Sequence, residues 1–207
     1  DTAEGEKLFK ADRIFINTGA TPFVPPVEGL TIGGAIHTSE TIMNLEEYPE
    51  SLVIIGSGFI GLEFAATYAQ FGTKVTVIDV IDAFLPREDE DVAQAVKEQL
   101  EALGVTFNLG VQLKAVHQEG GKAVVEATTG EGAPVAFTAD AVLVATGRRA
   151  NVQGLDLDKA GVELTERGAI KVNEFLQTNV PHIFAMGDVN GGPQFTFVSL
   201  DDFRIVK

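Results

Sequence analysis

The sequence predicts an α/β fold with a central parallel sheet, helices and a β-meander. Short runs rich in Val and Ile end at a glycine or a polar turn, as buried parallel strands do. Two segments between these runs have helical periodicity, and a later region alternates apolar and polar residues. With 207 residues and 45% hydrophobic content, the chain can bury a sizeable core.

Four apolar runs are the expected strands of this fold. They are residues 13–19 (RIFINTG), 52–56 (LVIIG), 74–79 (KVTVID) and 141–147 (AVLVATG). The runs are continuous rather than alternating, which indicates strands that are buried on both faces. We therefore expect a parallel sheet that helices cover.

Two helices are expected between these strands. Residues 59–71 (FIGLEFAATYAQF) follow the second run, and Gly72 can end this helix in a left-handed conformation. Residues 89–103 have apolar side chains spaced by four, four and three, which form one helical face: Val92, Val96, Leu100 and Leu103. Acidic residues occupy the first turn of this second helix, as the helix dipole favours, and Gly104 closes it.

The pattern changes between residues 105 and 138, where short alternating stretches are divided by Gly120–Gly121 and by residues 130–132. Such a pattern is typical of a hairpin or a meander. Two other segments, the proline-rich residues 22–26 and residues 151–171, are expected to cross between two folding units.

Composition and charge exclude several classes of partner. The chain has 15 Lys and Arg against 30 Asp and Glu, so its net charge is −15. A nucleic-acid backbone or an anionic membrane would repel this surface, and we expect neither as a partner. No apolar run approaches the ~20 residues that span a bilayer. The absence of cysteine excludes disulfides and thiolate metal sites within these residues, and it is compatible with a reducing cytosol without demanding one. We predict no metal site and a cytoplasmic location.

The motif that carries chemistry is Gly56-Ser57-Gly58-Phe59-Ile60-Gly61, a G-x-G-x-x-G pattern between an expected strand and an expected helix. Its first glycine permits a tight turn, the second lets the backbone approach a pyrophosphate, and the third lets the helix pack closely on the strand. The free amides at the start of the helix then face an anion. The motif therefore predicts a dinucleotide site, with ordinary glycine turns as the alternative.

Asp79 indicates which nucleotide binds, because it ends the next expected strand 23 residues after Gly56. Its carboxylate can accept a hydrogen bond from the 2′-hydroxyl of an adenine ribose. A 2′-phosphate would meet like charge, which costs about 4 kcal/mol at 4 Å with an effective dielectric of 20. Solvent and salt reduce this cost to about 1–2 kcal/mol, or roughly tenfold in affinity. We predict NADH over NADPH; the alternative is an acid that only caps a strand.

Four stretches resemble the pyridine nucleotide-disulfide oxidoreductases, the flavoenzyme family of lipoamide dehydrogenase, glutathione reductase and mercuric reductase. They are INTGATP (16–22), VIIGSGFIGLEFA (53–65), VATGRRAN (144–151) and QTNVPHIFAMGDV (177–189). They occur in the family's order and cover nearly the whole chain. The tail, residues 191–205, is most similar to the mercuric-reductase-like branch that includes reactive-chlorine-resistance proteins.

The resemblance implies roles for the residues of the NAD(P)H site. The pyrophosphate would be bound by Gly56, Ser57, Gly58 and Gly61, and Ile60 would belong to the same NADH site. The nicotinamide crevice would be completed by Thr146 and Gly147. Phe59 and Glu63 are four residues apart and project from the same helical face. The resemblance places Phe59 as a gate between nicotinamide and flavin, and pairs Glu63 with a lysine of the flavin domain. Taken alone, Phe59 could be a core residue and Glu63 a partner of the helix dipole.

The resemblance also implies a flavin site and a domain organisation. Thr18 and Gly19 would form a turn of the FAD domain, and Gly187 and Asp188 belong to a G-D motif that binds the flavin's ribityl chain. Residues 1–40 and 156–207 would be two partial arms of a Rossmann-like FAD domain, and residues 41–155 the NAD(P)H domain. The histidines of the chain are interpreted as structural: His37, His117 and His182.

The sequence does not contain the family's FAD-binding G-x-G-x-x-G, its C-x4-C redox pair or its C-terminal histidine–glutamate pair. We therefore expect the middle part of a longer homodimeric flavoenzyme, whose missing FAD and C-terminal domains are its partners. In that protein NADH would reduce FAD, and FAD a redox disulfide outside this chain. This part alone is expected to bind NADH without turnover.

Two other functions account for part of the sequence. A non-catalytic NAD(H)-sensing module would use residues 56–61 and Asp79 equally well, but would not need the A-T-G and G-D motifs. A methyltransferase shares the strand, glycine turn and acid, but leaves the second half of the chain unexplained.

Overall fold

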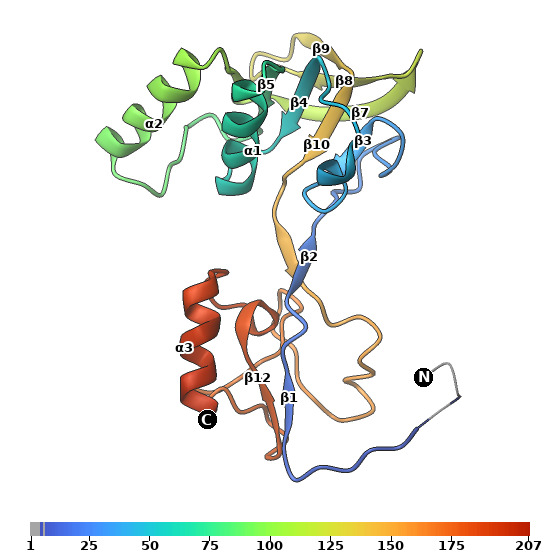
Figure 1. Ribbon diagram of the computed structural model, residues 1–207, viewed down its shortest axis with the longest axis vertical. Helices are drawn as coiled ribbons and strands as arrows, with labels where there is room; N and C mark the ends of the chain where they lie inside the picture. The colour runs from blue at the N-terminus through green and yellow to red at the C-terminus, as the bar shows by residue number, and fades with distance from the viewer. Residues whose placement is uncertain (1–4, 6) are drawn as a thin grey trace. The chain divides into compact units, whose positions relative to one another are not determined.

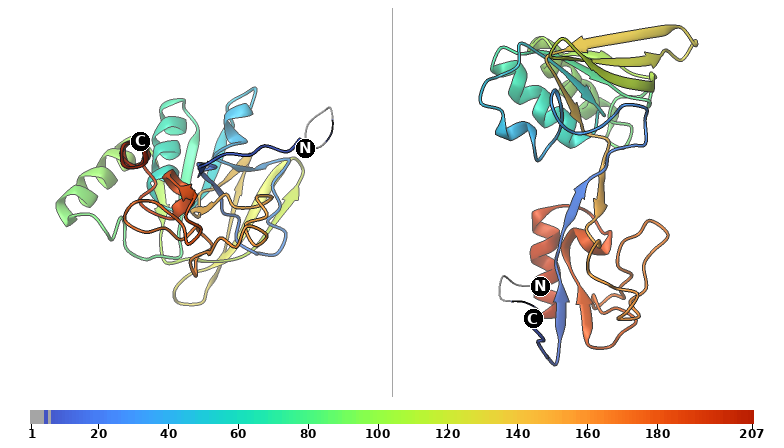
Figure 2. Two further views of the ribbon diagram at one scale, coloured as in Figure 1. Left: turned by 90° about the horizontal axis from the view of Figure 1, so that it is seen from below. Right: turned by 90° about the vertical axis from the view of Figure 1, so that its right-hand side faces the viewer.

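The computed structural model describes residue 5 and residues 7–207, which fold as two compact units (Figure 1; Figure 2). The larger unit is Pro22–Gly147, and the smaller unit combines Arg148–Lys207 with the described residues up to Thr21. These bounds differ from the predicted ones, at 40/41 and 155/156. The difference arises because β3 (Ile36–Thr38) pairs with β10 (Ala141–Val144) in the larger unit.

A five-stranded parallel sheet forms the centre of the larger unit, and the predicted α/β class is confirmed. Its strand order is β3, β10, β4 (Ser51–Ile55), β5 (Lys74–Ile78) and β6 (Thr106–Asn108). The three predicted strands of this unit are the three inner strands of the sheet. The two edge strands, β3 and β6, are three residues long and have no continuous apolar run that would have predicted them.

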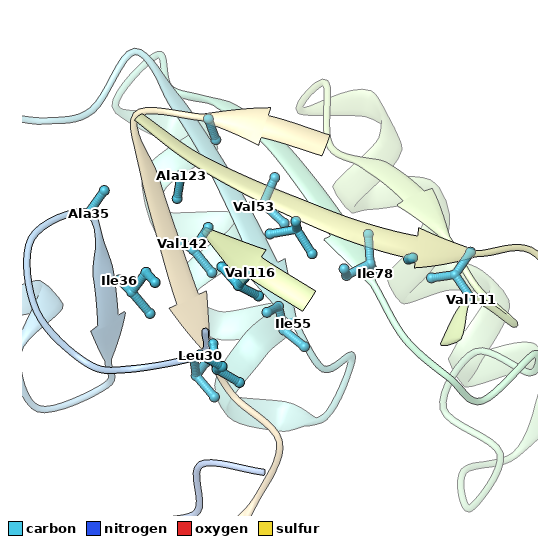
Figure 3. Packing of buried hydrophobic residues seen from close by; sticks show 14 residues of the cluster. Leu30, Ala35, Ile36, Val53, Ile55, Ile78, Val111, Val116, Ala123 and Val142 are labelled. Carbon is cyan, nitrogen blue, oxygen red and sulfur yellow. The ribbon is translucent and has the colours of Figure 1, made fainter. Parts of the chain in front are cut away.

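Side chains of the inner strands alternate between two cores. Leu52 and Ile54 of β4 pack with the helices α1 (Phe59–Gln70) and α2 (Glu90–Ala102). Val53 and Ile55 pack with the meander on the opposite face (Figure 3). Both faces are therefore buried, as the continuous apolar runs predict. The helices cover one face of the sheet, and the predicted meander covers the other.

The meander consists of β7 (Gln112–Glu119), β8 (Lys122–Thr128) and β9 (Pro134–Ala139), paired antiparallel in that order. It confirms the alternating pattern predicted from the sequence. Asp140, which follows β9, joins the meander to the sheet. Its carboxylate accepts hydrogen bonds from the backbone N–H of Ser51 at 2.9 Å and from the Ser51 hydroxyl, and pairs with the Lys122 ammonium at 2.7 Å.

Replacing Asp140 by asparagine is expected to lower the melting temperature (Tm) at neutral pH and to remove part of its acid sensitivity. The Lys122 ammonium and the Ser51 hydroxyl lower the pKa of Asp140 from its ordinary 3.8 to about 2. A depressed carboxyl pKa stabilises the fold above the unfolded pKa, and this contribution is lost as the pH falls through the folded value. The Tm of the wild type and of Asp140→Asn should therefore differ most above pH 4 and converge near pH 2. A Tm difference that stayed constant over this range would contradict the argument.

Both helices begin and end within two residues of their predicted bounds. Gly72 and Gly104 follow them with φ of +90° and +89°, as predicted. The predicted face of α2 was partly wrong, since Val92 and Leu103 are 49% and 42% exposed. The buried residues of α2 are instead Ala93 and Leu100, and Val96 packs partly buried against the same core as Leu100. Val92 lies about 100° around the helix from Ala93, which leaves it exposed.

The smaller unit has a parallel pair of strands, β1 (Ile14–Ile16) and β12 (Ile183–Ala185). A second pair is β2 (Ala20–Pro22), which ends at the first residue of the larger unit, and β11 (Arg148–Ala150). It also contains α3 (Thr196–Val206) and the short helix η2 (Gly187–Asn190), whereas η1 (Ile42–Asn44) belongs to the larger unit. The expectation that residues 13–19 form a strand buried on both faces was wrong. Phe15 is 43% exposed: in the described part of the chain its sheet has two strands, and stacking on its neighbour Phe184 covers its ring only in part.

The prediction that residues 151–171 cross between two units was wrong, because these residues lie within the smaller unit. They supply Leu157, Val162 and Ile170 to its core, with Ile183 and Val189. An extended crossing segment would not bury these side chains. In the part of the chain that the structure describes, no helix has the length and hydrophobicity of a membrane span.

Candidate dinucleotide-binding site

The sequence motifs of the larger unit meet at one edge of its sheet. The glycine motif follows β4, Asp79 follows β5, and Thr146–Gly147 follow β10, and these three strands are parallel neighbours. The chain runs from β4 outward to β5 and β6, while β10 lies on the other side of β4. Ligands of α/β sheets bind at the carboxyl ends of the strands where the order reverses in this way. The fold therefore brings the predicted residues to the same edge of the sheet.

The three glycines of the motif are glycines for different reasons. Gly56 has φ +111°, and a Cβ there would overlap the carbonyl of Ala145. A Cβ on Gly61 would overlap the carbonyl of Gly56, so the helix can lie against the strand only without it. Gly58 has an ordinary φ of −73°, and an added Cβ would meet no protein atom within 4 Å. The chain itself therefore requires Gly56 and Gly61, but it does not require Gly58.

Four consecutive amides at the start of α1 are available to an anion. The first hydrogen bond of the helix runs from the Leu62 N–H to the Gly58 carbonyl, at 3.0 Å. The N–H groups of residues 58–61 have no acceptor among the described residues. The first turn also contains no acidic side chain. Unpaired amides and the positive end of the helix dipole together favour a phosphate at this position.

The carboxylate of Asp79 is held by three donors of the chain. Its Oδ2 accepts the backbone N–H of Ser57 at 2.6 Å and the Ser57 hydroxyl at 2.7 Å. Its Oδ1 accepts the N–H of Ile81 at 3.0 Å. The Gly56 N–H is also engaged, by the carbonyl of Ile78 at 2.8 Å. The resemblance implied that Gly56 and Ser57 bind the pyrophosphate, but the chain itself already engages their amides. The open donors begin at Gly58.

Phe59 and Glu63 both lie on the exposed side of α1. Phe59 is 54% exposed, so the alternative that it is a core residue is wrong. Glu63 lies one turn further along the helix, beyond the first turn. It lines a surface groove of about 510 Å³, together with aromatic side chains that include Tyr48, Tyr68 and Phe71. An apolar ring and a carboxylate are therefore exposed about one turn apart on α1, the helix whose first amides are open.

Thr146 and Gly147 form hydrogen bonds with Phe23, near the start of the larger unit. The Thr146 hydroxyl donates to the carbonyl of Phe23 at 2.7 Å, and the Phe23 N–H donates to the carbonyl of Gly147 at 2.9 Å. Gly147 is exposed and has φ +117°. The sequence contained no signal for Phe23, because its partners lie more than 120 residues away in the chain.

The four residues assigned to a flavin site meet within the smaller unit. Thr18 and Gly19 follow β1, and Gly187 and Asp188 follow its parallel partner β12. The Thr18 hydroxyl donates to the Asn151 carbonyl at 2.6 Å, which holds this turn in place. The carboxylate of Asp188 has no hydrogen-bond partner in the described part of the chain. It is therefore available to a ligand at this edge.

Asp202 is a residue of this site that the sequence did not point to. It lies on α3, is 8% exposed, and accepts the Gly187 N–H at 2.8 Å and the Asn190 side-chain amide at 3.1 Å. It thus fixes the turn that carries Asp188. An acid on a largely apolar helix is the signal that would have found it.

The three histidines lie on three different segments of the chain. His37 lies on β3, where burial lowers its pKa below the ordinary value. His117 lies on the meander, 3.8 Å from Glu126, and His182 precedes β12 in the smaller unit. No group of three metal-ligating side chains occurs among the described residues.

The chain is similar to known flavoenzymes. The model of the family described as pyridine nucleotide-disulphide oxidoreductase matches residues 1–202. RclA of Escherichia coli, described as a probable pyridine nucleotide-disulfide oxidoreductase, is 42% identical over 204 residues, 99% of this chain and 45% of RclA. Dihydrolipoyl dehydrogenase of Bacillus subtilis is 38% identical over 198 residues, 96% of this chain and 42% of that enzyme.

A solved structure extends these similarities to the fold. The Cu(II) complex of the HOCl-induced flavoprotein disulfide reductase RclA from Escherichia coli matches with a TM-score of 0.93 and 39% identity. The match covers 100% of this chain and 46% of that one. The chain thus spans less than half the length of these relatives. They agree with the resemblance drawn from the four motifs and with the branch that residues 191–205 indicate.

Proposed function

Because the chain belongs to the pyridine nucleotide-disulphide oxidoreductase family, we propose that its larger unit binds NADH within a FAD-dependent oxidoreductase. The observation that carries the proposal is Gly58. Neither its backbone angles nor its neighbours require a glycine, so the fold alone leaves its identity unexplained. A pyrophosphate that approaches the backbone closely would explain it.

The residues of the crevice suit a dinucleotide. The open amides of residues 58–61 would donate to the pyrophosphate, and Asp79 would accept a hydrogen bond from the adenine ribose. The choice of NADH over NADPH rests on the charge of Asp79 and on the absence of a nearby arginine cluster in the sequence. Phe59 would cover the nicotinamide end of the crevice, which Thr146 and Gly147 complete.

The smaller unit supplies residues suited to a flavin. Asp188 would accept hydrogen bonds from a polyhydroxyl chain, and the turn of Thr18 and Gly19 would face it across the edge of β1 and β12. When bound, the two groups supply hydride transfer from nicotinamide to flavin and onward reduction of a disulfide. Glu63 would pair with a cation of the flavin-binding part, close to the ring of Phe59.

The activity of the whole protein is part of the same proposal. Its relatives are described as a flavoprotein disulfide reductase and as dihydrolipoyl dehydrogenases, which supports disulfide chemistry outside this chain. We also propose a homodimer and a cytoplasmic location for that protein. A non-catalytic NAD(H)-sensing module would use the same crevice, but it leaves the two turns of the smaller unit without a role.

Calorimetric titration of the 207-residue chain with NADH and with NADPH tests the proposal. We expect NADH to bind roughly tenfold more tightly than NADPH, and Asp79→Ala to bring the two dissociation constants within about twofold. Asp82→Ala, which removes an exposed acid three residues away, is the matched control and should keep the preference. Tighter binding of NADPH by the wild type would overturn the choice of coenzyme, and binding of neither would overturn the site.

A further inference from the structure

Ser57 links the two loops that frame the candidate crevice. It is 6% exposed, and both of its donors reach the same carboxylate oxygen of Asp79, at 2.6 and 2.7 Å. One loop carries the open amides, and the other carries the acid that faces the ribose. We propose that the Ser57 hydroxyl sets the coenzyme preference by holding Asp79 in one orientation, an inference that rests on the proposed function.

The hydrogen bonds of Asp79 leave a single acceptor direction open. A carboxylate oxygen accepts about two hydrogen bonds. Ser57 fills both positions on Oδ2, and the Ile81 N–H fills one on Oδ1. One lone pair of Oδ1 therefore remains for a ligand. A ribose hydroxyl can donate to this position, whereas a 2′-phosphate has no proton to donate when fully ionised and meets negative charge.

The same contacts decide how firmly Asp79 discriminates. Without the Ser57 hydroxyl, Oδ2 keeps one donor, and the carboxylate can turn about its bond to Cβ. It then holds the ribose hydroxyl less well, and it can also turn away from a 2′-phosphate. Loss of the hydroxyl should therefore lower the affinity for NADH more than the affinity for NADPH. If Ser57 merely supported the loop, its replacement would lower the affinities for both coenzymes by the same factor.

The test measures Ser57→Ala and the wild type with three ligands: NADH, NADPH, and NADH that lacks the 2′-hydroxyl of its adenosine ribose. We expect Ser57→Ala to bind NADH about fivefold more weakly, and the other two ligands within twofold of the wild type. The preference for NADH over NADPH should then fall from about tenfold to about twofold. The deoxy ligand isolates the hydrogen bond at issue, because it has no 2′-hydroxyl to donate to Asp79.

Two further variants separate the hydroxyl from its volume. Ser57→Cys fills the same space with a weak donor and should behave like Ser57→Ala, whereas Ser57→Thr keeps the hydroxyl and should restore the preference. Thr106→Ala, which removes a hydroxyl from the edge strand β6, is the matched control and should change no ligand's affinity. The Tm of each variant reports whether it folds.

Two results would overturn the inference while leaving the proposed function in place. One is an equal loss of affinity for all three ligands, and the other is an unchanged preference in both Ser57→Ala and Ser57→Cys. If the wild type bound neither coenzyme, the proposed function would fail, and the role of Ser57 would fail with it.

Discussion

Replacing Gly58 by valine is expected to abolish NADH binding and to leave the fold of the larger unit intact. The backbone at Gly58, with φ −73° and ψ 175°, is extended and accepts any L-residue. No protein atom lies within 4 Å of an added Cβ, so the new side chain would occupy the space in front of the open amides. Since a pyrophosphate must enter that space, we expect the affinity for NADH to fall by about 100-fold or more, which is roughly 2.7 kcal/mol.

Titration calorimetry measures this loss, and thermal unfolding checks the fold. The Tm of Gly58→Val should stay within about 2 °C of the wild type, as for other substitutions at open surface positions. Gly72→Val is not a suitable control, because Gly72 has a positive φ that a valine would strain. Thr67→Val, at an exposed position two turns further along α1, suits better and should bind NADH normally. Binding of NADH by Gly58→Val with unchanged affinity would remove the observation on which the proposed function rests.

Replacing Gly61 by alanine is expected to have the opposite effect, a loss of stability. Its Cβ would overlap the Gly56 carbonyl and would also lie 3.3 Å from the Ile54 side chain. A backbone carbonyl cannot turn aside as a flexible side chain can, so α1 must move away from β4. We expect the free energy of unfolding of the larger unit to fall by about 3 kcal/mol. For a chain of this size, Tm would then fall by roughly 6–12 °C.

Urea and thermal unfolding of Gly61→Ala check this expectation, with Ala66→Gly as a control on the same helix. That control removes a partly buried methyl group and costs about 1 kcal/mol by helix propensity alone. A smaller loss for Gly61→Ala than for Ala66→Gly would show that the helix can shift without cost. The close contact of α1 with β4 would then not be the reason for the third glycine.

Much of the larger unit could be predicted from the sequence because its signals are local. The inner strands are runs of apolar residues, and both helices carry their own end signals, Gly72 and Gly104. The edge strands β3 and β6 were missed, since three residues carry no periodicity and pair only because a neighbouring strand is present. The predicted crossing at residues 151–171 failed for a related reason, because its apolar residues are separated by turns.

The candidate site likewise has features that the sequence predicted and features that it did not. The spacing of the glycine motif and Asp79 predicted which residues would meet, because parallel strands end at one edge of a sheet. This spacing did not predict that the N–H and the hydroxyl of Ser57 both donate to Asp79. It also did not predict that Asp202 accepts the N–H of Gly187. The roles of Phe59 and Glu63 came from the resemblance, and the structure adds that both lie on an exposed face of α1.

The sequence by itself determined the fold class, the inner strands, the helices and the family, because each depends on residues close together in the chain. Tertiary structure alone decided which amides remain open, which oxygen of Asp79 keeps an open acceptor position, and which face of α2 is packed. The contacts of Ser57 with Asp79, for example, join atoms of residues 22 apart in the chain at 2.6 and 2.7 Å. A hydrogen bond lost or gained at that range is invisible to spacing and composition, because it depends on orientation as much as on proximity.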